Sequence, residues 1–120
     1  KVMVFKRSSV VYKFAEYWSI PSGHREEGET PKECAIRETF EETEIKIKDP
    51  SEVKLLKEVD TGSGIFYVYH WRMNKFQKPK LDFEHTEWLL TGDVSNLEPI
   101  QPEMRNIIDG VLDDIQTTNR

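Results

Sequence analysis

Short apolar stretches, each bounded by Gly, Pro or polar residues, recur along the first part of the chain and are typical of β-strands. The longest apolar run, IFYVYHWRM at residues 65–73, is expected at the centre of a sheet. Pro79 excludes a central strand from the loop that follows. Residues 45–49 (IKIKD) alternate, which predicts a half-exposed strand. The expected strands are residues 2–7, 18–23, 45–49, 52–60, 65–73 and 86–94.

Two segments carry helix signals instead. Thr30 is expected as an N-cap and Pro31 as the first helical residue, and Glu33 completes a capping box. This helix is expected to end at residue 43 or 44. From Pro102 the apolar residues recur at i, i+3 and i+4, which predicts a C-terminal amphipathic helix. Its apolar stripe is Met104, Ile107, Ile108, Val111, Leu112 and Ile115. Strands interrupted by one helix and closed by another predict a layered α/β domain.

Length and charge narrow the possible functions. The chain has 120 residues, which predicts a single domain over residues 1–120. It begins without Met inside an expected strand, so we expect upstream residues to be missing from this sequence. Its net charge is −5, and stable nucleic-acid binding is not expected because phosphate neutralisation needs clustered Lys and Arg. An acidic chain that handles phosphates is expected to need a bound cation.

Apolar runs and cysteine usage give two further limits. No apolar run approaches the length of a membrane span, so we expect no membrane partner. Cys34 is the only cysteine, which excludes an intramolecular disulfide and the Cys-pair zinc patterns. A single cysteine fits a reducing, cytoplasmic setting.

Glutamate is concentrated in residues 23–45, where eight of the 23 residues are Glu. At roughly 100° per residue, Glu38, Glu41 and Glu42 share one arc of the expected helix. Their like charges repel by about 0.2–0.5 kcal/mol per pair, and one arginine, Arg37, cannot neutralise all three. A divalent cation could, since Mg²⁺ is usually held by one or two carboxylates with waters and substrate phosphates. The spacing alone leaves open the alternative of a solvated acidic face. The opposite arc, expected to face the sheet, carries Ile36, Thr39, Phe40 and Thr43.

The same segment resembles the Nudix box, G-x5-E-x7-R-E-U-x-E-E-x-G-U, in which U is a bulky aliphatic residue. The matching positions are Gly23, Glu29, Arg37, Glu38, Glu41, Glu42 and Ile45. Thr39 stands where the family usually has an aliphatic residue. Glu44 replaces the second glycine, which usually ends the helix in a left-handed conformation. A residue with a side chain costs about 1 kcal/mol or more there, which puts the shape of the helix exit in question.

The resemblance implies a Nudix fold, a mixed β-sheet sandwiched between α-helices. It also implies a Mg²⁺-dependent hydrolase, with Mn²⁺ as a substitute. The substrate would be a nucleoside diphosphate linked to another moiety, cut at a pyrophosphate bond by water. Two alternatives stay open: a nucleoside triphosphate pyrophosphatase of the housecleaning type, and a non-catalytic domain that binds a nucleotide. The sequence does not decide whether the protein forms a homodimer.

By the same resemblance, Glu38, Glu41, Glu42 and the Gly23 carbonyl are the expected metal ligands. Arg37 belongs to the implied catalytic set. It is expected to pair with Glu29, or to brace Glu41 together with it, rather than to take part in bond breaking.

The general base stays open between Glu41 in the box and Glu84 or Glu87 in FEHTEW, since each needs only to reach the attacking water. Glu84 and Glu87 are equally well explained as ordinary loop acids that have no catalytic role.

Four residues outside the carboxylate set are candidates for substrate contact. Arg7 ends the first expected strand and could reach a phosphate, as could His24 beside the first box glycine. Tyr17 and Trp18 precede the box, and stacking of a base on an aromatic side chain contributes about 1–3 kcal/mol. Tyr12 and Phe14 lie in the same stretch. For each of these residues a plain surface or core position is the alternative.

Overall fold

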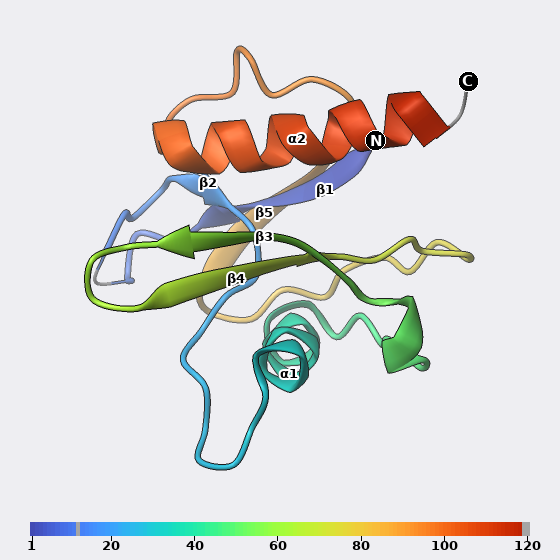
Figure 1. Cartoon of the computed structure of the whole chain (residues 1–120). Helices are drawn as coiled ribbons and strands as arrows, with labels where there is room; N and C mark the ends of the chain where they lie inside the picture. Colours follow the sequence, from blue (N-terminus) through green and yellow to red (C-terminus); the bar gives the residue numbers. More distant parts are fainter. Residues whose placement is uncertain (12, 119–120) are drawn as a thin grey trace. The chain divides into compact units, whose positions relative to one another are not determined.

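Strand β1 (Val2–Arg7) forms where the sequence predicts it, in a computed structural model that describes residues 1–11 and 13–118 (Figure 1). The chain divides into two units, which are described in turn. The first unit comprises Lys1–Ile20 and Leu81–Arg120, and the second is Pro21–Lys80. That residues 1–120 form a single domain stays a prediction. So does Tyr12 as a stacking residue, since it lies outside the described residues.

The first unit contains a three-stranded antiparallel sheet in the order β2-β1-β5. Strand β2 is Trp18–Ser19 and strand β5 is His85–Thr91. Helix α2 (Pro102–Thr118) lies along β1 (Figure 1). A single isolated bridge, which is parallel, joins Trp18 to Ile100 in the described part of the chain.

Helix α2 supplies half of the core of this unit, as its apolar stripe predicts. The buried cluster consists of Val4, Val94, Ile100, Met104, Ile108 and Leu112. Trp18 and Ile20 pack against this cluster from the β2 side. The core therefore fixes β1 and β2, and with them the loop that joins these two strands.

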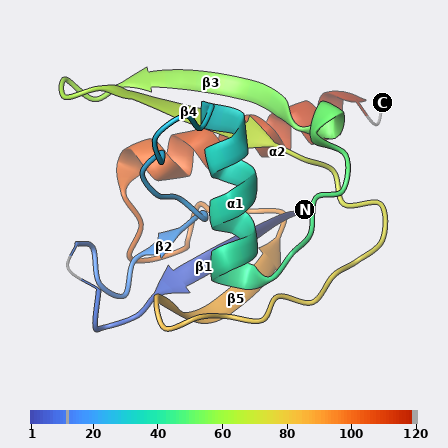
Figure 2. The same cartoon turned by 90° about the horizontal axis from the view of Figure 1, so that it is seen from below.

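The second unit contains helix α1 (Pro31–Thr43) and the antiparallel pair of β3 (Lys54–Asp60) with β4 (Ile65–His70). A short 3-10 helix, η1 (Pro50–Glu52), precedes β3. The turn between β3 and β4 closes with a 2.9 Å hydrogen bond from the Thr61 N–H to the Gly64 carbonyl. Helix α1 lies beside β4 (Figure 2).

The capping box predicted at the start of α1 is confirmed. The Glu33 N–H donates to the Thr30 hydroxyl oxygen at 3.1 Å, and the Thr30 N–H donates to the Glu33 carboxylate at 2.9 Å. Two helix-end donors are thereby satisfied, which sets the first turn of the helix. The predicted helix end at residue 43 or 44 is also confirmed.

Two strand predictions in this unit are wrong. Residues 45–49 form no strand, because the Gln77 side chain takes over the hydrogen bonds of the Lys46 backbone. Gln77 accepts from the Lys46 N–H at 2.8 Å and donates to the Lys46 carbonyl at 2.9 Å. The second error concerns β4, which is not central: among the described strands it pairs with β3 alone.

The helix exit keeps a left-handed conformation although glutamate stands at the glycine position. Glu44 has φ 57° and ψ 16°, and its N–H donates to the Phe40 carbonyl at 2.8 Å. The Lys80 N–H donates to the Thr43 carbonyl at 2.8 Å, and the Lys80 ammonium lies 3.8 Å from the Glu44 carboxylate. Lys80 therefore holds the exit in place from a distant part of the sequence.

Replacing Glu44 by glycine is expected to stabilise the fold. The left-handed conformation costs a residue with a side chain about 1–2 kcal/mol, and glycine loses part of that gain through its freedom in the unfolded chain. We expect Glu44→Gly to raise the free energy of unfolding by about 0.5–1 kcal/mol in urea denaturation. Glu44→Ala is the control, because it keeps the strain and loses the Lys80 contact. A lower stability for Glu44→Gly would mean that the contacts of Glu44 outweigh its strain.

Candidate metal centre

The guanidinium of Arg37 lies at the centre of the box residues. Its Nε and Nη2 donate to the two carboxylate oxygens of Glu29 at 2.7 and 3.0 Å. Its Nη1 donates to Glu38 at 2.8 Å and to Glu41 at 3.1 Å. Nη2 also donates to the His24 carbonyl at 3.0 Å. The predicted pairing of Glu29 with Arg37 is therefore confirmed, and the arginine also contacts two of the expected metal ligands.

These contacts hold Glu29 and Arg37 in their charged forms. Hydrogen bonds from the Arg37 side chain and from the Glu26 N–H lower the pKa of Glu29 from 4.5 to about 2. Hydrogen bonds to Glu29 and then Glu38 raise the pKa of Arg37 above its ordinary value. The pair is therefore ionised throughout the neutral range, and it links the loop before α1 to the helix.

Gly23 comes so close to Glu38 that no side chain fits between them. A Cβ placed on Gly23 would collide with the carboxylate of Glu38. The Gly23 carbonyl accepts a weak hydrogen bond from the Cys34 thiol, with the sulfur 3.6 Å away. The glycine thus allows the backbone of the loop to lie against a carboxylate of α1, in a part of the chain rich in oxygen ligands.

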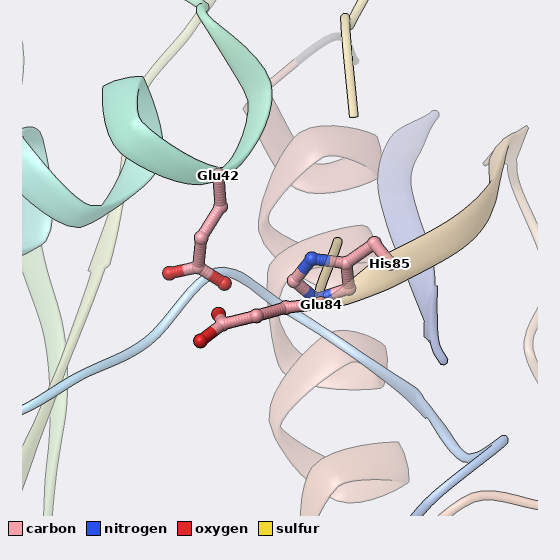
Figure 3. A group of neighbouring side chains, drawn as sticks. All are labelled: Glu42, Glu84 and His85. Atoms are coloured by element: carbon pink, nitrogen blue, oxygen red, sulfur yellow. The ribbon is translucent and has the colours of Figure 1, made fainter. Parts of the chain in front are cut away.

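Glu42 is the most buried of the three helix carboxylates. It is only 2% exposed, and one of its oxygens accepts a hydrogen bond from the Ser22 N–H at 3.2 Å. Its side chain leaves the last turn of α1 (Figure 3). The Glu38 side chain is 14% exposed and that of Glu41 is 53% exposed. Burial therefore increases from Glu41 through Glu38 to Glu42, so the three carboxylates do not form a uniformly solvated acidic face.

The opposite arc of α1 only partly matches its predicted role. Thr43 is fully buried, and its hydroxyl donates to the Thr39 carbonyl at 2.6 Å. The Thr39 hydroxyl donates to the Ala35 carbonyl at 2.7 Å, so the threonine at the aliphatic position of the box satisfies its own hydroxyl. Phe40 is 43% exposed, and the prediction that it faces the sheet is wrong.

Sequence reasoning missed two groups at this site. The backbone N–H of Ser22 contacts Glu42. The sequence does not indicate this contact, because a backbone N–H does not depend on the identity of the side chain. The second group is Cys34, which is four residues before Glu38 and therefore lies on the carboxylate arc. Burial raises the pKa of its thiol. That helical spacing was the signal that could have placed Cys34 beside the loop.

The remaining candidates lie in the first unit, apart from His24, which is exposed and contributes its carbonyl to Arg37. Trp18 packs against the hydrophobic core, whereas Arg7 donates through Nε to the Lys13 carbonyl at 3.0 Å. Tyr17 forms an aromatic pair with Phe14. The roles of these residues toward substrate stay predictions.

The two late glutamates differ in their surroundings. Glu87 on β5 forms an ion pair with Lys6 at 3.4 Å. Glu84 precedes the strand, next to His85 (Figure 3), and its carbonyl accepts from the Ser8 N–H at 2.8 Å. Burial lowers the pKa of His85, which favours the neutral imidazole. The general base stays open between these glutamates and Glu41.

A family model described as NUDIX domain matches residues 1–111 of the chain. Similar solved structures include an Ap4A hydrolase from C. elegans, at 20% identity and a TM-score of 0.66, where the match covers 96% of this chain and 85% of that one. The MutT protein from Methanosarcina mazei Go1 is 21% identical with a TM-score of 0.70, over 95% and 83% of the two chains. A MutT/nudix family protein from Enterococcus faecalis is 14% identical with a TM-score of 0.74, over 96% and 54%. These likenesses confirm the fold class expected from the sequence.

Removing the charge of Glu29 is expected to change how stability depends on pH. Because the pKa of Glu29 is lowered on folding, its charge stabilises the fold fully above about pH 4.5, and this contribution is lost as the pH falls toward about 2. Glu29→Gln should therefore be less stable than the wild type near neutral pH, with a difference that shrinks over this acid range. Thermal unfolding across the range measures it, with the exposed Glu27→Gln as control. A difference that stays constant with pH would contradict the role of the charge.

Proposed function

Because the chain belongs to the NUDIX domain family, we propose that it is a Mg²⁺-dependent pyrophosphohydrolase that cleaves nucleoside diphosphates linked to another moiety. Family membership makes it a hydrolase of phosphoric anhydride bonds. The cation, the substrate class and the residue roles are the proposed part. The observation that carries the proposal is the carboxylate face of α1, where the Gly23 backbone lies against Glu38 and Glu42 is buried.

The proposed metal ligands are Glu38, Glu41, Glu42 and the Gly23 carbonyl. All four offer hard oxygen atoms, which suit Mg²⁺ and also Mn²⁺. A bound cation would neutralise the pyrophosphate and lower the pKa of the attacking water. In this proposal Arg37 positions Glu38 and Glu41 through its two Nη1 contacts, and it does not touch the substrate.

The substrate in this proposal is a nucleotide-type small molecule, and the setting is the cytoplasm. Within the described residues, no helix is both long enough and apolar enough to cross a membrane. The net charge of −5 supports the absence of stable nucleic-acid binding. A homodimer is left open.

A substrate panel with matched variants tests the catalytic proposal. Wild-type protein is expected to release phosphate-containing product only with Mg²⁺ or Mn²⁺, from at least one of ADP-ribose, a dinucleoside polyphosphate, a sugar nucleotide or a nucleoside triphosphate. Cleavage of the triphosphate alone would favour the housecleaning alternative. Glu41→Gln and Glu42→Gln should each lower kcat by about 100-fold or more. Glu27→Gln, an exposed acid of the same segment, should match the wild type. Unchanged rates in the first two variants would show that the catalytic assignment is wrong.

The general base is expected to control the acid side of the pH–rate profile. The base must be deprotonated to act. The value of kcat/KM therefore decreases at pH values below the pKa that the base has in the free enzyme. Replacing the base by glutamine should lower kcat/KM and flatten this acid limb, whereas replacing the other candidates should leave the limb in place. Profiles of Glu41→Gln, Glu84→Gln and Glu87→Gln identify it. If all three keep the acid limb, none of the three is the base.

Cation binding itself is expected to stabilise the fold. A ligand at 100 times its Kd stabilises the state that binds it by about 2.7 kcal/mol. Thermal unfolding should therefore shift upward with Mg²⁺ in the wild type and much less in Glu42→Gln. The absence of a shift in the wild type would favour a solvated acidic face over a metal site.

A further inference from the structure

Two neighbouring segments of the second unit, residues 45–48 and 75–80, present lysine to solvent. The Gln77 side chain bonds both the N–H and the carbonyl of Lys46, which fixes one segment against the other. Exposure follows a pattern along both segments, because Ile45 and Pro79 are buried whereas the lysines are exposed. We call the exposed residues of the two segments the basic strip: Lys46, Lys48, Lys75, Phe76, Lys78 and Lys80.

The positive charge of the basic strip is largely uncompensated. The Lys80 ammonium lies 3.8 Å from the Glu44 carboxylate. Four other ammonium groups make no ion pair and no hydrogen bond with any described residue, namely those of Lys46, Lys48, Lys75 and Lys78. The chain as a whole has a net charge of −5, so this local positive surface stands out against an acidic background.

An aromatic ring lies within the same strip. Phe76 is 56% exposed and stands between Lys75 and Lys78 in the sequence. Aromatic residues are enriched at the centres of protein interfaces, where they act as anchors. The strip therefore combines directed positive charge with one apolar side chain.

The solvent side of α2 carries the opposite charge. At roughly 100° per residue, four acids fall within an arc of roughly 140° on the side away from the apolar stripe. We call this arc the acidic face of α2, and its acids are Glu103, Asp109, Asp113 and Asp114. Asp109 and Asp113 repel each other as i, i+4 neighbours, and the last turn of the helix contains no basic residue. Acids near a helix C-terminus also oppose the helix dipole, so a cationic partner would relieve both effects.

Gly110 lies in the middle of the acidic face. It follows Asp109 directly, and Asp113 and Asp114 are three and four residues after it. A Cβ at Gly110 would meet no heavy atom within 4 Å, apart from its own neighbours in the helix. Packing within the chain therefore does not require glycine here, although glycine weakens a helix relative to alanine. The missing side chain leaves room for another molecule to come close to the helix backbone.

We propose that the acidic face of α2 is a docking surface for the basic strip of a second copy of this chain. In this contact the Phe76 ring of one copy lies against Gly110 of the other, and the lysines beside the ring pair with the surrounding aspartates. Charge complementarity favours this partner, because one contact neutralises two surfaces that lack compensation within the chain. A nucleic acid or an anionic membrane would use the strip alone and leave the acidic face and Gly110 unexplained.

The strength of this contact follows from its exposure to water. Exposed ion pairs contribute little each, and salt screens them. The association is therefore expected to be weak and to disappear at high ionic strength. It does not depend on the proposed catalytic function, because none of its residues belongs to the box.

Sedimentation equilibrium of the full chain, over a concentration series at low and at high salt, tests the contact. The strip variant carries Lys46→Glu and Lys78→Glu, and the helix variant carries Asp109→Lys and Asp114→Lys. A control variant with Lys13→Glu and Lys54→Glu makes the same charge change at two exposed lysines outside the strip. Thermal unfolding of each variant confirms that it is folded.

The wild type is expected to associate at low salt and not at high salt. The strip variant and the helix variant should each weaken the Kd of self-association by roughly 10-fold or more, and the control variant should not. An equimolar mixture of the strip and helix variants should associate again, because the reversed strip then meets the reversed helix face. Recovery in the mixture is specific to a contact between these two surfaces.

Two further variants test the centre of the contact. Phe76→Ala removes the ring and Gly110→Gln fills the space above the helix backbone, and neither changes the charge. Each should weaken self-association by roughly 10-fold, whereas Phe83→Ala, at a phenylalanine that is 75% exposed, should leave it unchanged.

Three results would overturn the proposal. The first is a wild type that stays monomeric at low salt at every concentration. The second is a mixture of the strip and helix variants that fails to associate. The third is a monomeric wild type that binds single-stranded RNA or anionic vesicles and loses this binding in the strip variant, which would assign the strip to that partner instead.

Discussion

The guanidinium of Arg37 is the constraint on which the candidate site depends. It contacts Glu29, Glu38 and Glu41 together with the carbonyl of His24. Three carboxylates at one end of a small unit would repel one another, and the fixed fork of the arginine sets both their charge balance and their geometry. Because two of the three come from α1 and the third from the preceding loop, the same contacts hold the loop against the helix. A lysine could not reproduce this arrangement, since it offers one point charge instead of five directed donors.

The loop and the helix are adapted to this constraint at several points. The capping box fixes where α1 begins, and the lack of a side chain at Gly23 lets the loop backbone lie beside Glu38. The N–H of Ser22 meets the buried carboxylate of Glu42. At the other end of the helix, Glu44 adopts a left-handed conformation that is strained for glutamate and would not be strained for glycine. The helix is therefore held at both ends. These contacts, more than the number of acidic residues, determine where the acidic face of the helix lies.

The sequence predicted the features that depend on neighbouring residues. The capping box, the bounds of α1 and the apolar stripe of α2 all follow from spacings of three or four residues, and so does the arc shared by Glu38 and Glu42. The features that the sequence did not predict depend on residues that are far apart along the chain. Gln77 is 31 residues from Lys46, and its amide removes the strand expected there. The exposed position of Phe40 likewise depends on what packs around the helix, which helical periodicity alone does not give.

The chemistry proposed for this protein depends on the second unit, where the carboxylates of α1 supply oxygen ligands for a cation. Binding of a divalent cation by the carboxylate face of α1 is tested most directly by anomalous X-ray scattering from crystals grown with Mn²⁺. We expect a manganese peak coordinated by the carboxylates of Glu38 and Glu42, with the Gly23 carbonyl as a further ligand. A map with no peak at α1, or with manganese bound only elsewhere, would contradict it.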